Sequence, residues 1–283
     1  MARQQKKYQI KNLNSGDINF DSFKKKLQKY LNDYQIKKIE KAYIIASKAH
    51  EGQLRKSGEA YIEHPLSAAS YLSDFQLDYE TIMAAILHDV IEDTEINMEV
   101  LQQEFGMKVS QLVDGVSKLD KINFSSKEEA DAANLRKMIL AMSQDIRVIL
   151  IKLADRIHNL ETISVLKAQQ RRKIAKETLE IYAPIALRLG IHNMSIHMED
   201  LAFQSLYPLR FKILQNFIND ARGNRKELMK KIKKIVEDKL MDEGLNADVL
   251  AREKHVYGIY KKMKHKELKF SQIHDIFGVR ITT

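Results

Sequence analysis

The most constraining feature of this 283-residue chain is an apolar run that ends in ionisable side chains. Residues 83–94 read Met-Ala-Ala-Ile-Leu-His-Asp-Val-Ile-Glu-Asp-Thr. A helix that is hydrophobic nearly all round must be buried, and burying several ionisable groups at its end destabilises the fold unless something compensates. A bound cation would compensate. A polar last turn of a core helix, without any ion, is the alternative interpretation of this run.

The spacing within the run indicates how a metal and a water could share it. His88 and Glu92 are four residues apart, as are Asp89 and Asp93, so each pair occupies neighbouring positions one turn apart on a helix. An imidazole and a carboxylate could bind one metal while two further carboxylates hold a water. The dipeptide alone is weak evidence, because a second His-Asp pair occurs at 274–275.

Two other stretches place polar residues in unusual surroundings. Residues 49–65 contain a glycine-bounded loop that precedes His64 and carries Arg55, Lys56 and Ser57. In residues 153–162, three polar residues recur at i, i+4 and i+7 on an otherwise apolar segment. The run before them is too apolar for a surface helix, so Asp155 is expected to point inward, where it needs a partner. The three polar residues are Asp155, Asn159 and Thr162.

Three separated helices together contribute a set of two imidazoles and two carboxylates. The set consists of His64, His88, Asp89 and Asp155. The set resembles the HD phosphohydrolase superfamily. The surrounding motifs resemble the hydrolase domain of the bifunctional RelA/SpoT homologues, which make and destroy guanosine tetra- and pentaphosphate. The likeness runs from about residue 36 to residue 208, and its markers are Arg-Lys-Ser-Gly-Glu (55–59), Tyr-Ile-Glu-His-Pro (61–65), His-Asp-Val-Ile-Glu-Asp-Thr (88–94), Asp-Arg-Ile-His-Asn (155–159) and Ala-Pro-Ile-Ala-Leu-Arg-Leu-Gly (183–190).

The resemblance implies an enzyme that hydrolyses the 3′-diphosphate of guanosine tetra- or pentaphosphate, giving GDP or GTP and pyrophosphate. One divalent ion is expected, and the implied ligands are His64, His88, Asp89 and Asp155. The resemblance implies manganese as the cofactor, although iron, zinc or nickel could occupy the same set. Glu92 and Asp93 are the candidate catalytic residues that position the attacking water and take its proton. The expected nucleotide contacts are Arg55, Lys56, Ser57, Asn159 and Thr162.

Several nearby residues are not assigned to the chemistry. The family pattern gives no metal to His50 or His158, so both are expected to be structural or supporting groups, and Arg156 is expected to pair with a carboxylate. No carboxylate partner is evident for the five remaining histidines, His192, His197, His255, His265 and His274. Ala60 and Glu161 stand where the family usually has proline and arginine, which bears on loop stiffness and on charge near the substrate.

The composition favours long helices, since 283 residues contain only 3 prolines and 10 glycines. We predict a mainly α fold: an HD-domain helical bundle, linker helices and the beginning of an α/β synthetase domain. The expected divisions are an amino-terminal segment (1–34), the hydrolase domain (35–195), linker helices (196–245) and a truncated synthetase start (246–283). Helices are predicted at 35–51, 65–74, 79–92, 97–104, 108–119, 128–143, 145–165, 169–189, 196–204, 208–240 and 252–264, with Asp78 as an N-cap and a kink or restart at Pro184.

The carboxy-terminal residues resemble the start of the family's synthetase domain. Residues 252–263 match its beginning and residues 274–281 its first catalytic strand, which is expected to lack a sheet to join. The second acidic catalytic residue and the usual regulatory domains are absent from this sequence. Alarmone synthesis by pyrophosphate transfer from ATP is therefore an alternative for the full-length protein rather than for this chain. A catalytically silent nucleotide-sensing fragment is the other alternative.

Charge and composition exclude some classes of protein. The chain has no cysteine, which excludes disulfides and thiolate metal sites. Residues 210–283 hold 18 Lys and Arg against 10 Asp and Glu, so they carry most of the net charge of +9. Such runs are usually solvated helix faces, and no direct nucleic-acid binding is expected. No apolar stretch approaches the ~18 residues of a membrane span. We therefore expect a cytoplasmic enzyme without membrane contact.

Overall fold

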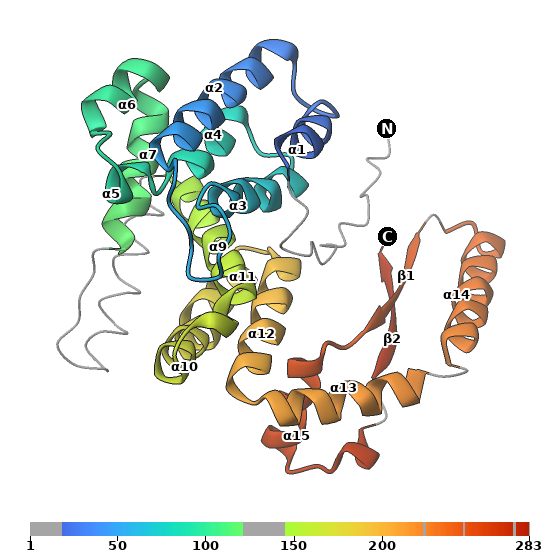
Figure 1. Ribbon diagram of the computed structural model, residues 1–283. Coiled ribbons are helices and arrows are strands. Elements are labelled where there is room, and N and C mark those ends of the chain that lie inside the picture. The colour runs from blue at the N-terminus through green and yellow to red at the C-terminus, as the bar shows by residue number, and fades with distance from the viewer. Residues whose placement is uncertain (1–18, 121–144, 223–224, 246, 274–275, 283) are drawn as a thin grey trace. The chain divides into compact units, whose positions relative to one another are not determined.

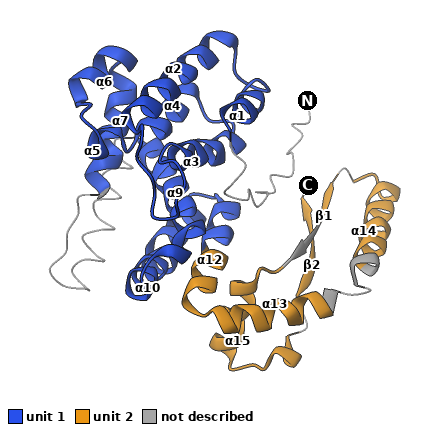
Figure 2. Cartoon of the chain, viewed as in Figure 1, with its two compact units in different colours: residues 1–198 blue, residues 199–283 orange. Residues whose placement is uncertain are grey.

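The computed structural model describes residues 19–120, 145–222, 225–245, 247–273 and 276–282. The described chain is mainly helical, which confirms the predicted fold class (Figure 1). It divides into two compact units, residues 1–198 and residues 199–283 (Figure 2). The predicted domain limits at 195 and 245 stay a prediction. None of the helices within the described ranges is long and apolar enough to cross a membrane.

Unit 1 is built from helices and helical turns. In chain order they are α1 (Phe20–Leu27), α2 (Asp33–Ala49), α3 (Glu63–Asp74), α4 (Tyr79–Leu87), α5 (Val90–Asp93), α6 (Met98–Phe105), α7 (Met107–Asp120), α9 (Ile146–Glu161), the 3₁₀ turn η1 (Ile163–Val165), α10 (Ala168–Glu177), the π-helical turn η2 (Thr178–Tyr182), α11 (Ala183–Arg188) and α12 (His192–Leu206). Helix α12 continues past the limit of the unit. The predicted helix 128–143 lies outside the described residues.

Helix α4 is the buried centre of unit 1. Every residue from Thr81 to Leu87 is buried, and α2, α3, α7 and α9 pack around the helix (Figure 1). Asp78 caps it as predicted, since its Oδ1 accepts a hydrogen bond from the Thr81 amide at 3.0 Å. Such a cap is worth about 1 kcal/mol. Because α3 and α9 also pack against each other, the three helices that carry the histidine and aspartate candidates meet in one place.

Two predicted helices of unit 1 are interrupted. The helix predicted at 79–92 is two helices, because His88 and Asp89 form a turn between α4 and α5. The helix predicted at 169–189 contains the π-helical turn η2, which ends two residues before Pro184. Proline has no amide hydrogen and its ring clashes with the preceding turn, so a regular helix cannot run through it. The restart expected at Pro184 is therefore confirmed.

Unit 2 combines helices with a short hairpin. Its elements after α12 are α13 (Pro208–Arg222), α14 (Arg225–Asp242), β1 (Asp248–Glu253), α15 (Val256–Lys266), the 3₁₀ turn η3 (Phe270–Gln272) and β2 (Phe277–Thr282). Four buried isoleucines form its core, with partly buried apolar residues around them. They are Ile218, Ile259, Ile273 and Ile276.

Three expectations for unit 2 are wrong. The helix predicted at 208–240 is described as two helices, and the helix predicted from residue 252 begins at Val256 because residues 248–253 form β1. Strand β2 has a partner: it pairs antiparallel with β1, from Asp248 opposite Thr282 to Glu253 opposite Phe277. The short segment that precedes the helix therefore supplies the neighbouring strand. Asp275 lies outside the described residues.

Candidate metal centre and nucleotide pocket

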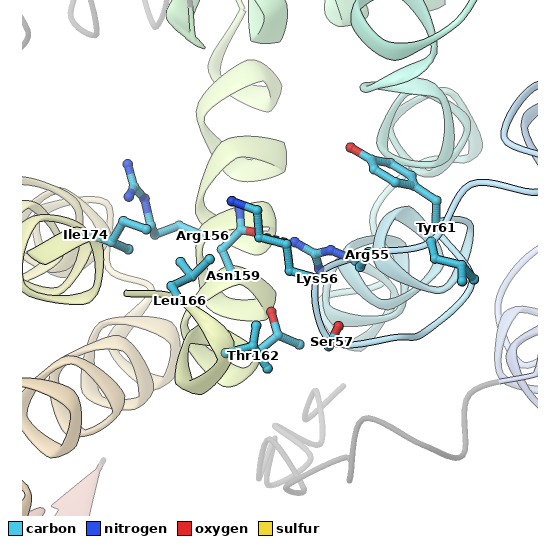
Figure 3. A pocket seen from close by; sticks show the side chains of 11 residues that line it. Arg55, Lys56, Ser57, Tyr61, Arg156, Asn159, Thr162, Leu166 and Ile174 are labelled. Carbon is cyan, nitrogen blue, oxygen red and sulfur yellow. Dashed lines mark hydrogen bonds between the residues drawn. The ribbon is translucent and has the colours of Figure 1, made fainter. Parts of the chain in front are cut away.

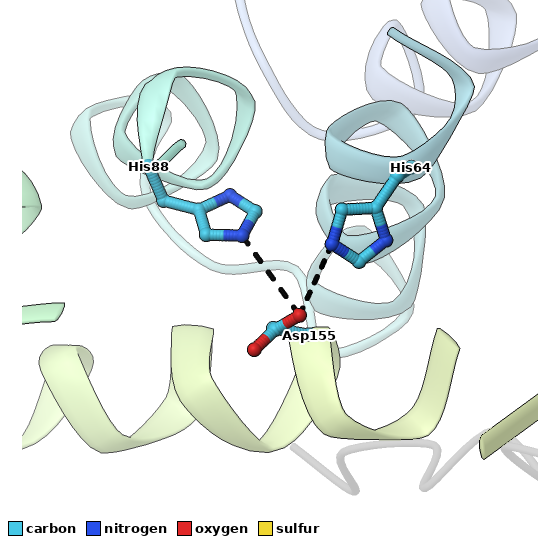
Figure 4. A group of neighbouring side chains, drawn as sticks. All are labelled: His64, His88 and Asp155. Carbon is cyan, nitrogen blue, oxygen red and sulfur yellow. Dashed lines mark ion pairs between the residues drawn. The ribbon is translucent and has the colours of Figure 1, made fainter. Parts of the chain in front are cut away.

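Two histidines and one aspartate meet at the centre of unit 1 (Figure 4). His64 lies in the first turn of α3, His88 directly follows α4, and Asp155 lies on α9. All three are buried, and one ligand atom from each lies within 4.8 Å of the others. His64 Nε2 is 3.1 Å and His88 Nε2 is 3.9 Å from the same Asp155 Oδ1. The arrangement is a compact group of nitrogen and oxygen donors.

Asp89 completes the predicted set of four. Its Oδ1 lies 3.1 Å from His88 Nε2 and its Oδ2 lies 3.6 Å from His64 Nε2. The Asp89 side chain is 19% exposed, whereas that of Asp155 is only 5% exposed. The turn between α4 and α5 thus brings two consecutive side chains to one place, and Asp89 occupies the side of the group that is open to solvent.

The proton positions on His88 follow from its partners. His88 Nδ1 lies 2.8 Å from the carbonyl oxygen of Ala85, which can only accept a hydrogen bond. A neutral His88 ring therefore carries its hydrogen on Nδ1 and has a lone pair on Nε2. This Nε2 is buried and has no hydrogen-bond partner among the described residues. An unpartnered buried nitrogen that faces carboxylates fits a cation ligand.

The proton positions on His64 are set through two further residues. The guanidinium of Arg55 donates to His158 Nδ1 at 2.9 Å, and this same atom lies 2.8 Å from His64 Nδ1. Because arginine only donates, His158 Nδ1 is an acceptor and His64 Nδ1 carries the hydrogen. The lone pair of His64 Nε2 then points at Asp155. His158 is thus a supporting group, as expected.

The electrostatics favour neutral rings at His64 and His158, whereas the carboxylates around His88 favour its charged form. Burial lowers the pKa of His64 and, with the neighbouring His64 and Arg55, lowers the pKa of His158 to about 3. Burial also opposes charge on His88, but the Asp89 and Asp155 carboxylates outweigh it and raise the pKa of His88. Burial alone would raise the pKa of Asp155. Lys152, His64 and His88 outweigh it and hold this pKa well below its usual range.

The donor set fits a divalent metal ion. Two imidazole lone pairs and two carboxylates converge from different helices, and mixed nitrogen and oxygen donors suit manganese, iron, zinc or nickel. With neither a metal ion nor an added proton on the rings, lone pairs would face ionised oxygens across about 3 Å in a buried place, which is electrostatically unfavourable.

Lys152 is a member of the site that was not predicted from the sequence. It is buried, and its Nζ donates to Asp155 Oδ2 at 2.6 Å. Asn159 donates to the other oxygen, Asp155 Oδ1, also at 2.6 Å. The available signal was a lysine inside the apolar run 146–154, three residues before the aspartate. Lys152 balances part of the negative charge of Asp155 from the side away from the histidines.

Glu92 and Asp93, the predicted catalytic pair, lie on α5 and are exposed. Glu92 Oε1 accepts a hydrogen bond from Ser117 of α7. Asp93 Oδ2 accepts one from the Tyr61 hydroxyl at 2.5 Å, and the same hydroxyl lies 3.1 Å from Asp89 Oδ2. Burial and the two aspartates raise the pKa of Tyr61, so its hydroxyl stays protonated. Tyr61 was quoted above only as part of the motif 61–65. Its hydroxyl joins Asp93 to the set of His64, His88, Asp89 and Asp155, which is called the metal group below.

A cavity of about 460 Å³ opens beside this group (Figure 3). All five predicted nucleotide contacts line it, together with Tyr61, Arg156 and several apolar side chains. Three of the lining residues are basic. The complete lining is Leu54, Arg55, Lys56, Ser57, Tyr61, Arg156, Asn159, Thr162, Val165, Leu166 and Ile174. A basic wall next to apolar residues suits a ligand that carries phosphates and a flat base.

Arg55 connects the pocket loop to helix α9. Its guanidinium donates to Asn159 Oδ1 at 2.6 Å and to His158, so it reaches across the cavity (Figure 3). The loop closes on itself through hydrogen bonds from the Arg55 amide to the Glu59 carbonyl and from the Gly58 amide to the Arg55 carbonyl. Gly58 has a φ of +91°, which side chains rarely tolerate. The loop thus holds Arg55 in a defined place.

Other expectations for charged residues had mixed outcomes. Arg156 has the expected carboxylate partner, Glu177, at 3.4 Å, and it also stacks on Tyr182 at 4.1 Å. The expectation for His197 and His255 is wrong. His197 Nε2 lies 3.1 Å from Glu161, which does not line the cavity, and His255 Nε2 lies 2.7 Å from Glu199. Both pairs join residues far apart in sequence, which spacing along the chain does not indicate.

Comparison with known proteins gives two family matches. The family described as "HD domain" matches residues 42–192, and the one described as "Region found in RelA / SpoT proteins" matches residues 251–283. The first match contains the metal group and the cavity.

Individual relatives are similar over most of this chain. The protein named bifunctional (p)ppGpp synthase/hydrolase SpoT, from Escherichia coli (strain K12), is 52% identical over 262 residues, which are 93% of this chain and 37% of the relative. A Myxococcus xanthus protein named GTP pyrophosphokinase is 46% identical over 258 residues, 90% of this chain and 34% of the relative. The chain therefore spans little more than a third of these proteins. A solved structure described as a metazoan ortholog of SpoT that hydrolyzes ppGpp aligns with a TM-score of 0.47 and 26% identity, over 61% of this chain and 97% of that one.

Proposed function

Because this chain belongs to the HD-domain family and carries the start of a RelA / SpoT region, we propose that it hydrolyses the 3′-diphosphate of guanosine tetra- and pentaphosphate. The products would be GDP or GTP and pyrophosphate. The names of relatives such as SpoT support the substrate class. One observation carries the proposal: the Nε2 atoms of His64 and His88 converge with two carboxylates beside a cavity that has a basic wall.

We infer that His64, His88, Asp89 and Asp155 hold one divalent ion, and that this ion is manganese. The orphaned Nε2 of His88 and the mixed nitrogen and oxygen donors support this assignment. When bound, such an ion supplies Lewis-acid polarisation of a phosphoryl oxygen and lowers the pKa of a nearby water. Lys152 contacts Asp155 Oδ2, whereas the histidines face Asp155 Oδ1. The ion would therefore bind on the Oδ1 side.

The chain's own carboxylates handle the proton in this proposal. Glu92 and Asp93 lie on α5, directly after Asp89, so they border the open side of the metal group. One of them would accept a proton from the attacking water as its oxygen bonds to the phosphorus attached to the ribose 3′ oxygen. The bond between this phosphorus and the 3′ oxygen breaks, the 3′ oxygen takes up a proton from solvent to become a hydroxyl, and the diphosphate is released as pyrophosphate. Hydrogen bonds from Ser117 and Tyr61 keep both carboxylates in place.

The cavity would bind the nucleotide. Arg55 and Lys56 offer positive charge to the phosphates, and the planar guanidinium of Arg55 can also stack on the base. Ser57, Asn159 and Thr162 supply hydrogen-bonding groups along the same wall. Asn159 accepts a hydrogen bond from Arg55 and donates one to Asp155. A nucleotide that moves Arg55 would therefore also change the hydrogen bonding of Asp155, a proposed metal ligand.

The test is incubation of the chain with labelled guanosine tetraphosphate, with and without manganese, after treatment with a chelator. We expect release of GDP and pyrophosphate that needs the added metal, and its loss in the Asp155→Ala variant. Full activity in metal-free protein would contradict the proposed centre. Formation of tetraphosphate from ATP and GDP would instead support the synthetase alternative, and binding without turnover would support a silent sensor.

A further inference from the structure

Tyr61 lies where the pocket, the metal group and helix α5 meet. Its side chain lines the cavity, and its hydroxyl is within hydrogen-bond distance of both Asp89 and Asp93. No other residue that lines the cavity has a recorded contact with Asp93 among the described parts of the chain. Tyr61 is therefore placed to determine where the Asp93 carboxylate sits relative to the metal ligands.

Asp93 needs such a contact. It is the last residue of α5, which has only four residues, and a helix this short is not stable through its own hydrogen bonds. Its side chain is exposed, so without a partner the carboxylate would sample several rotamers in water. The 2.5 Å hydrogen bond from Tyr61 selects one of them.

The ring of Tyr61 is itself held firmly. It stacks on the buried His50 ring, with 4.5 Å between centroids and 16° between planes. Its edge meets His64 at 6.4 Å and 87°. Its backbone amide donates to the Gln53 carbonyl at 3.0 Å. The hydroxyl position is thus fixed by contacts that do not involve the hydroxyl.

The same loop also holds the backbone of Asp93. Gln53 Nε2 donates to the Asp93 carbonyl at 2.9 Å, and Gln53 Oε1 accepts from His50 Nδ1 at 2.8 Å. The backbone of Asp93 is therefore anchored by Gln53 and its carboxylate by Tyr61. Removing only the hydroxyl of Tyr61 should free the carboxylate while the loop, the stacked rings and the backbone anchor remain.

We propose that Tyr61 is a positioning residue, whose hydroxyl holds the Asp93 carboxylate against the Asp89 side of the histidine and aspartate group so that Asp93 can act on the attacking water. This inference rests on the proposed hydrolytic function. It adds a residue that acts through Asp93 and has no direct part in the chemistry.

The first test compares Tyr61→Phe with the wild type and with Tyr43→Phe. Tyr43 is a matched control, because its ring stacks on Phe20 at 4.2 Å in the same unit and it neither lines the cavity nor belongs to the group of ligand residues. The hydrogen bond from Tyr61 goes to a charged carboxylate, and such bonds stabilise a structure more than bonds between neutral groups. Its loss should therefore lower kcat about 10-fold to 100-fold. KM should stay within about 2-fold of the wild type. Because the Tyr61 hydroxyl also lies 3.1 Å from Asp89 Oδ2, kcat is measured at saturating manganese. Tyr43→Phe should leave kcat and KM unchanged. An unchanged kcat in Tyr61→Phe would overturn the proposal.

The second test is a double-mutant cycle with Asp93→Asn. If Tyr61 acts through Asp93, the double variant Tyr61→Phe/Asp93→Asn should be no slower than Asp93→Asn alone. A multiplicative loss in the double variant would mean that Tyr61 acts independently, and would overturn the proposal.

A third measurement does not depend on turnover. Hydrogen exchange of the peptide that contains residues 90–94 should be faster in Tyr61→Phe than in Tyr43→Phe or the wild type, because the end of α5 loses one anchor. Unchanged exchange would overturn the positioning role even in a chain that hydrolyses the nucleotide. Faster exchange in a chain without hydrolysis would instead place the failure in the proposed function.

Discussion

The Nδ1 atoms of His64 and His158 face each other at 2.8 Å, and the Nδ1 of His158 also receives a hydrogen bond from Arg55. An arginine in the pocket loop therefore fixes the proton on a histidine of the metal group, through hydrogen bonds that run by way of His158. The relation matters because metal-binding histidines depend on the partner of their other nitrogen for orientation and basicity.

We predict that His158→Ala weakens manganese binding by about 10-fold to 100-fold, because His64 loses the acceptor that fixes its proton. Isothermal titration with manganese measures the change directly. His265→Ala serves as the control, since His265 is exposed and lies in unit 2. Equal affinity in His158→Ala and the wild type would contradict the role given to His158.

Glu92→Gln and Asp93→Asn should keep their metal but lose at least about 10²-fold in kcat, which is the contribution typical of an acid–base group. The reason is that Asp89 and Asp155 both lie within 4 Å of the histidine Nε2 atoms, whereas no such contact joins Glu92 or Asp93 to either histidine among the described residues. Metal content by mass spectrometry and steady-state kinetics together test the division of roles. Glu95→Gln, an exposed neighbour, is the control. Loss of metal in either variant would show that the substituted carboxylate is a metal ligand rather than an acid–base group.

Lys152→Met should destabilise the metal-free protein by about 3 kcal/mol or more, because it leaves the buried Asp155 charge without its lysine. Saturating manganese should restore part of this loss, since the cation faces the same carboxylate. Urea unfolding with a chelator and with manganese measures both values. Lys118→Met, which breaks an exposed pair with Asp114, should change little. The same loss with and without metal would argue against an ion at Asp155.

Glu199 should make the chain sensitive to acid. Burial raises its pKa, but hydrogen bonds from His255 and Lys261 outweigh burial and hold the pKa below its usual range. A depressed pKa in the folded state means that ionised Glu199 stabilises the protein above the unfolded pKa of about 4.3. This stabilisation is lost as the pH falls through the folded value.

Glu199→Gln should therefore be less stable than the wild type near pH 7, and the difference should shrink below about pH 4. Circular dichroism can follow unfolding, since the chain has no tryptophan. Glu237→Gln, which removes an exposed helical pair with Lys233, is the control. A difference that does not change with pH would contradict the assigned ion pairs.

Local sequence predicted those features of the fold that depend on local interactions. The Asp78 cap, the restart at Pro184 and the buried helix after residue 78 each follow from neighbouring residues. The break at His88 and Asp89 did not, because a helical pattern continues across it. The partner of β2 also escaped prediction, since the six residues of β1 carry no strong strand pattern and pairing depends on the packing of unit 2.

The site divides in a similar way. The sequence motifs singled out the two histidines and two aspartates that meet at His88 Nε2 and all five predicted contacts on the cavity wall, and the structure places these residues together. Lys152, Tyr61 and the link from Arg55 to His158 were not predicted. Tyr61 and Arg55 connect segments that are distant in sequence, and Lys152 balances the charge of Asp155. Such pairings depend on which side chains the packed helices bring face to face.

The buried helix α4 has a consequence for how this site can change. Ten positions separate the cap at Asp78 from His88, and each residue of a helix adds about 1.5 Å of rise and about 100° of rotation. Inserting or deleting one residue in α4 would turn the imidazole away from His64 and Asp155 while leaving every functional side chain in the sequence. The length of this helix is therefore as strict a requirement as the identity of the ligands, and homologous chains should accept substitutions in α4 far more readily than changes in its length.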